Sequence, residues 1–106
     1  MKRDEEERRL PPMPILKRMV GEQIILPLRQ SLDHAITARR LASEGDYNVI
    51  WRPYCDDAAC EIDKMSREVQ AIPDDADPDS AYAKVRLAIQ NEPHIKRTIQ
   101  ALEIGI

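Results

Sequence analysis

Apolar residues recur at helical spacing along most of the chain. Between residues 15 and 44 they return every four positions and form one long stripe. Its members are Leu16, Val20, Ile24, Leu28, Leu32 and Ile36, with Met19 and Ala35 beside them. Gly45 follows directly, as is typical after a helix. The pattern predicts a helix over 15–44. Pro27 removes a backbone hydrogen bond and crowds the preceding turn, which predicts a kink or a break near Leu26.

Three more segments carry the same kind of signal. Residues 54–72 show an apolar seam with alternating three- and four-residue steps, typical of a packed helix. The seam consists of Cys55, Ala58, Ile62, Met65, Val69 and Ile72. Asp77 followed by Pro78 is a good helix start, which predicts a third helix over 78–90. A fourth helix is expected from Asn91, and its apolar face consists of Ile95, Ile99, Leu102 and Ile106.

The stretch 46–54 differs from these segments. Its β-branched and aromatic residues favour extended structure, and Pro53 disfavours a helical conformation for Arg52. We therefore expect one short extended segment near residues 47–51, with Trp51 anchored in the core beneath it. The predicted fold is all-α, an irregular bundle of four to five helices. It forms a single helical domain over 15–106, preceded by a charged and proline-rich flexible arm over 1–14.

Charge is unevenly distributed along the chain. The net charge is −3, but residues 53–80 carry nine acidic and two basic side chains, a net charge of −7. An acidic centre does not favour phosphate binding, whereas it suits a partner protein with a basic surface. No apolar run is long enough to span a membrane, and the acidic residues at 4–7 do not fit a signal peptide. We expect a cytoplasmic protein.

Motifs of catalysis and metal binding are weak. The chain has no glycine-rich phosphate loop and no serine flanked by glycines. Cys55 and Cys60 are separated by about 140° on a regular helix, which prevents a shared zinc site. The acidic run at 75–79 lacks the glycine and glutamate of a calcium loop. We expect neither an enzyme nor a cofactor or metal, and keep a small metal-binding protein or enzyme as the second alternative.

The preferred hypothesis is a non-catalytic protein-binding module: an adaptor, a regulator or an inhibitor, including one that blocks a nucleic-acid enzyme. Trp51, Arg52 and Tyr54 are residue types that often anchor interfaces. The acidic side chains expected to attract a basic partner are Asp56, Asp57, Glu61 and Asp63. The long stripe at 15–44 also suggests a homodimer, because so extended an apolar face needs a partner surface.

The first alternative is a small DNA-binding regulator. Residues 93–103 resemble the recognition helix of a helix-turn-helix, and 78–104 would supply the motif. In that resemblance the contacts to bases or phosphates come from His94, Lys96, Arg97 and Gln100. The turn before this helix lacks the usual glycine, and an ordinary hairpin of a helical bundle explains the same pattern.

Overall fold

The structure is a computed structural model that describes residues 11–43 and 45–105, and all its regular elements are helical. In chain order these elements are α2 (Met13–Val20), the π-helical turn η1 (Gly21–Ile25), α3 (Leu26–Ser43), the π-helical turn η2 (Tyr47–Trp51), α4 (Arg52–Gln70), α5 (Pro78–Ile89) and α6 (Glu92–Ile104). Within those residues there is no strand, so the all-α prediction is confirmed. Residues 1–10 of the expected arm lie outside this part of the chain. Helix α2 already begins at Met13, inside the segment that we assigned to the arm.

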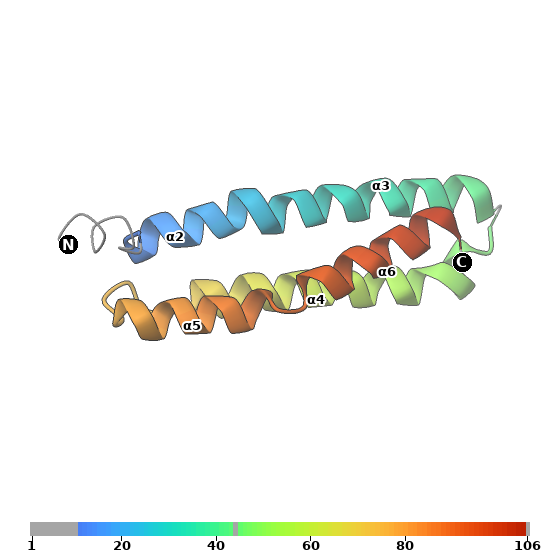
Figure 1. Cartoon of the computed structure of the whole chain (residues 1–106). Coiled ribbons are helices and arrows are strands. Elements are labelled where there is room, and N and C mark those ends of the chain that lie inside the picture. Colours follow the sequence, from blue (N-terminus) through green and yellow to red (C-terminus); the bar gives the residue numbers. More distant parts are fainter. Residues whose placement is uncertain (1–10, 44, 106) are drawn as a thin grey trace.

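The elements line up as three rods that run back and forth (Figure 1). The first rod is α2, η1 and α3, the second is η2 and α4, and the third is α5 followed by α6. Helix α6 packs against both α3 and α4, whereas α5 packs mainly against α4. Residues 11–43 and 45–105 therefore form a bundle of three rods, and the prediction of four to five separate helices is corrected.

Two features make the rods fewer than the expected helices: α5 and α6 run end to end as one rod, and Pro27 does not split the first rod. Each π-helical turn ends two residues before a proline, Pro27 after η1 and Pro53 after η2. In η1 the N–H of Leu26 donates to the carbonyl of Gly21, five residues back instead of four. The wider turn moves backbone carbonyls away from the proline ring, which relieves the clash that breaks a regular helix. The first rod thus passes through Pro27 without the expected break.

The same turn corrects the register of the first apolar stripe. Steps of four residues advance about 40° around a regular helix, so a long stripe drifts off the buried face. The extra residue in η1 resets this drift: Ile25 is buried in the core, whereas Ile24 is only half-buried. Met19, which we placed on the stripe, is exposed. The corrected buried set is Met13, Leu16, Val20, Ile25, Leu28, Leu32 and Ala35.

These residues are buried within the chain itself, in the same core as residues of α4, α5 and α6. The stripe therefore leaves no continuous apolar face free for a second copy. A homodimer through 15–44 was suggested because this apolar stripe needs a partner surface. The other helices of the same chain provide that surface.

The expected extended segment at 47–51 is helical instead. The N–H of Ile50 donates to the carbonyl of Asp46 at 2.9 Å, and η2 leads without interruption into α4. Packing outweighs the weak β-preference of these residues, because Tyr47 is buried and Trp51 packs half-buried against the core. Pro53 comes two residues after η2, so the wider turn accommodates its ring as η1 does that of Pro27.

The other helices follow the sequence pattern closely. The whole seam of residues 55–72 is buried, as are Ile95, Ile99 and Leu102. Asp77 caps α5, since its Oδ2 accepts a hydrogen bond from the N–H of Ser80 at 3.2 Å. Ile106 lies outside the described residues. No helix in the part of the chain described here is both long and apolar enough to cross a membrane.

Arg39 connects the three rods at the end of the bundle where α6 stops. Its guanidinium lies 5.0 Å from the centre of the Trp51 ring, and its Nη2 donates to the carbonyl of Glu103 at 3.4 Å. Gly105 follows with a φ of 91°, in the left-handed region where L side chains are strained. A Cβ on Gly105 would meet Arg39 Nη1 at 2.5 Å.

We therefore expect Gly105→Ala to lower the free energy of unfolding by about 1–2 kcal/mol. For a domain of this size, that corresponds to a melting temperature lower by roughly 5–15 °C. A urea titration followed by circular dichroism measures the change. Gly21→Ala is the matched control, because Gly21 has a helical φ of −59° and a Cβ there meets nothing within 4 Å. Equal effects at both glycines would contradict the interpretation that the left-handed φ of Gly105 requires a glycine.

Candidate functional site

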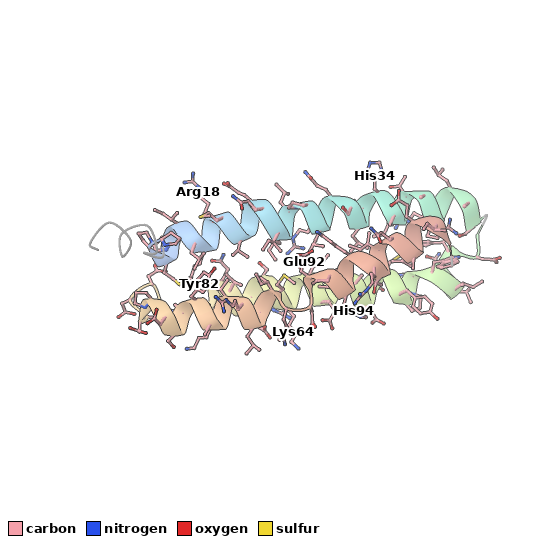
Figure 2. The ribbon with its side chains drawn as sticks, viewed as in Figure 1. Arg18, His34, Lys64, Tyr82, Glu92 and His94 are labelled. Atoms are coloured by element: carbon pink, nitrogen blue, oxygen red, sulfur yellow. The ribbon has the colours of Figure 1, made fainter. Side chains whose placement is uncertain are left out.

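A long groove lies between α4 and the third rod, and we call it the α4 groove. Four adjoining hollows form it, and neighbouring hollows share lining residues. The wall from η2 and α4 includes Ile50, Tyr54, Asp57, Glu61, Lys64 and Glu68. The opposite wall, from α5 to α6, includes Lys84, Leu87, Asn91, His94, Thr98 and Ala101. Figure 2 shows Lys64 and His94 directed toward the same side of the bundle, away from α3.

One end of the α4 groove is apolar. Its hollow has a volume of about 370 Å³ and is lined by Ile50, Trp51, Tyr54, Thr98, Ala101 and Leu102. Trp51 forms part of the hollow and is held by the guanidinium of Arg39. The Tyr54 ring lies 6.5 Å from the Trp51 ring at an angle of 55°. Ile50 and Tyr54 are 48 % and 58 % exposed, which is high for large apolar side chains. The end thus combines a fixed aromatic floor with exposed apolar edges.

The acidic residues of α4 fall into two groups. Asp56 pairs with Arg52 at 3.7 Å, and Asp63 pairs with Arg29 of α3 at 2.8 Å. Among residues 11–43 and 45–105, no cation pairs with Asp57, Glu61 or Glu68, and all three line the α4 groove.

The residues that we predicted to bind a partner are therefore only partly brought together. Trp51, Tyr54, Asp57 and Glu61 share the α4 groove. Arg52 and Asp56 are exposed on the same helix, where they pair with each other. Asp63 points to the flank of α4 that meets α3, so it belongs to a different surface.

The four residues of the DNA-binding alternative are all exposed on α6. His94 lines the α4 groove, and Lys96 pairs with Glu92 at 2.8 Å. Helices α5 and α6 run end to end and scarcely touch each other (Figure 1). A helix-turn-helix instead requires two helices that cross at about 90–120°. The arrangement at 78–104 therefore does not favour this alternative.

Thiols and imidazoles are scattered over the molecule. Cys55 is buried and Cys60 is exposed. His34 and His94 lie on different rods (Figure 2). In the described ranges no group of three or more His, Cys, Asp or Glu side chains is placed to hold a metal ion.

Tyr47 is the one group with a displaced pKa within the described residues. Burial raises the pKa of its hydroxyl, and the neighbouring Cys55 thiol adds to the increase. The Arg40 guanidinium, 5.0 Å from the ring centre, opposes this effect. The hydroxyl therefore stays neutral, and Tyr47 packs within the buried core.

Comparison with known proteins gives no relative: no family model matches the chain, and neither a curated protein nor a solved structure is similar to it.

The sequence pattern did not indicate the second wall of the groove. Thr98 and Ala101 meet Ile50 and Tyr54 only because α6 folds back along α4, a long-range contact that no local spacing reveals. We assigned Ile50 to an extended segment, so the sequence analysis did not place it one helical turn before Tyr54 on the same face. A signal was nevertheless present: positions 50, 54, 57, 61, 64 and 68 repeat at steps of three and four beside the core seam.

Proposed function

We propose that this protein is a non-catalytic binding module that occupies the surface of another protein through the apolar end of the α4 groove. The observation that carries this proposal is the hollow lined by Ile50, Trp51 and Tyr54, next to the carboxylates of Asp57 and Glu61 that lack an ion pair within the described residues. Aromatic side chains in a partly desolvated pocket commonly supply most of the energy of an interface. The flanking negative charge favours a partner with a basic surface.

Preorganisation supports the same interpretation. The Trp51 ring is fixed between Arg39 and the core, so a partner would not have to order it on binding. Tyr54 has only two side-chain torsions to restrict, which keeps its entropic cost low. A module of this kind acts as an adaptor, a regulator or an inhibitor, and the chemistry of the groove is shared by all three.

We expect Tyr54→Ala to weaken partner binding by at least about tenfold, because hot-spot aromatics contribute about 2 kcal/mol or more. Ile50→Asp should have a larger effect, because it places a charge in the hollow. The measurement is affinity capture from extract of the cells that produce the protein, followed by titration of the captured partner.

Ile15→Asp is the matched control, because Ile15 is 52 % exposed and lies on α2, away from the groove. It makes the same change in charge and size as Ile50→Asp. If wild type, Tyr54→Ala and Ile50→Asp capture the same partners with equal affinity, the proposal is wrong.

A further inference from the structure

The chemistry of the α4 groove extends well beyond its apolar end. The wall from Ile50 to Ala71 is roughly 30 Å long at the rise of an α-helix, and it is bordered by hollows along its length. Leu87 lies at the far end of the groove and is 63 % exposed. A partner that covered only the Trp51 end would leave this second apolar site unused.

We propose that the α4 groove binds an amphipathic helix of the partner, with apolar residues near both of its ends and Lys or Arg along the edge that faces α4. This inference rests on the proposed function and adds the shape and charge of the bound element. A groove between two packed helices fits a third helix, whose ridges meet both walls at steps of three and four residues.

Charge selects a basic helix. Within the part of the chain described here, the carboxylates of α4 outside the groove have basic partners, whereas Asp57, Glu61 and Glu68 in the groove have none. Lys64 is the one basic residue of the described α4 wall, and Lys84 lies on the opposite wall at the far end of the groove. A row of lysines or arginines on the docked helix would meet three carboxylates without first breaking an ion pair.

A second copy of the chain fits less well. The first rod buries its apolar stripe inside the bundle, so its exposed apolar residues are scattered rather than arranged as one face. In a second copy, α4 would carry the same acidic residues, so pairing two α4 grooves would place like charges together.

The test uses a synthetic 21-residue peptide with an acetylated N-terminus and an amidated C-terminus. It carries leucines near both ends, lysines along one edge and glutamines elsewhere. A second peptide has glutamates in place of the lysines. Trp51 is the only tryptophan and lines the groove, so its fluorescence reports binding directly. We expect the lysine peptide to bind at least about tenfold more tightly than the glutamate peptide.

Two variants test how far the helix extends. Leu87→Asp and the double variant Asp57→Ala/Glu61→Ala should each weaken binding of the lysine peptide about tenfold or more. Leu41→Asp is the control for the first, because Leu41 is 79 % exposed and lies on α3 outside the groove. Asp75→Ala/Asp79→Ala is the control for the double variant. It removes the same two negative charges, from exposed residues outside the groove. Both controls should stay within about twofold of wild type.

The outcomes separate this inference from the proposed function. If Tyr54→Ala weakens binding of peptide and cellular partner but Leu87→Asp changes neither, the full-length helix is wrong and the proposed function stands. If neither peptide binds, or if both bind equally, the basic helix is overturned. If sedimentation shows a wild-type dimer that Leu87→Asp makes monomeric, the groove holds a second copy and the inference is also overturned.

Discussion

Ile62→Asp is expected to abolish the cooperative fold at room temperature. Ile62 has no solvent exposure and lies at the centre of the seam on α4, which packs against both other rods. The change removes apolar burial and inserts a carboxylate without a partner, which together cost several kcal/mol. That is comparable to the total stability of a domain of this size, about 5–10 kcal/mol. The expected result is loss of the sharp thermal transition in circular dichroism.

The neighbouring residue provides the control for this prediction. Glu61 is exposed and has no ion-pair partner in the described ranges, so Glu61→Ala should change the free energy of unfolding by no more than about 0.5 kcal/mol. The two substitutions are one residue apart but differ by about 100° around the helix. A melting temperature of Ile62→Asp within a few degrees of wild type would show that the assigned face of α4 is not the core.

Local spacing predicted the fold well where a helix is regular. The seam of residues 55–72 and the apolar face of α6 were both identified, because steps of three and four residues map directly onto one side of an α-helix. The cap at Asp77 was also predicted, since a side chain that accepts from the backbone three residues ahead needs only local sequence.

Two of the errors in the predicted fold lie near prolines. The spacing of a regular helix predicts that Ile24 is in the core. Because η1 contains one additional residue, Ile25 is buried in its place. Similarly, the residues before Pro53 have a β-preference that packing of Tyr47 and Trp51 overrides. In both places the outcome depends on whether the surrounding bundle can hold a π-helical turn, and a short sequence window contains no such information.

In the candidate site, too, the local sequence predicted some features, whereas others depend on how the rods pack. Trp51, Tyr54 and Asp57 are close in sequence and lie in one groove, as the local pattern suggested. Asp63 is only six residues beyond Asp57, but its rotation around α4 brings it to Arg29 on the opposite flank. The second wall depends entirely on how the third rod docks, so the groove could not be derived before the fold was known.

Deletion of Gln23 is expected to lower the free energy of unfolding by about 3 kcal/mol, and the cause is Pro27. Without Gln23, the step from Val20 to Ile25 becomes four residues, which fits a regular α-helix. Gln23 is exposed, so the deletion removes no core side chain. A regular helix, however, places the ring of Pro27 against a carbonyl four residues back, at a cost of about 3 kcal/mol. The measurement is a urea titration at fixed temperature.

Pro27→Ala distinguishes this cause from simple damage by the deletion. In the full-length chain the substitution should change stability by less than about 1 kcal/mol, because η1 already relieves the clash. Combined with deletion of Gln23, it should restore most of the lost 3 kcal/mol, since the helix can then run regularly with its apolar residues in register. If η1 compensates for Pro27, the effects of the two changes on the free energy of unfolding should therefore be strongly non-additive. Additive effects would show that the π-helical turn and the proline are independent features of the first rod.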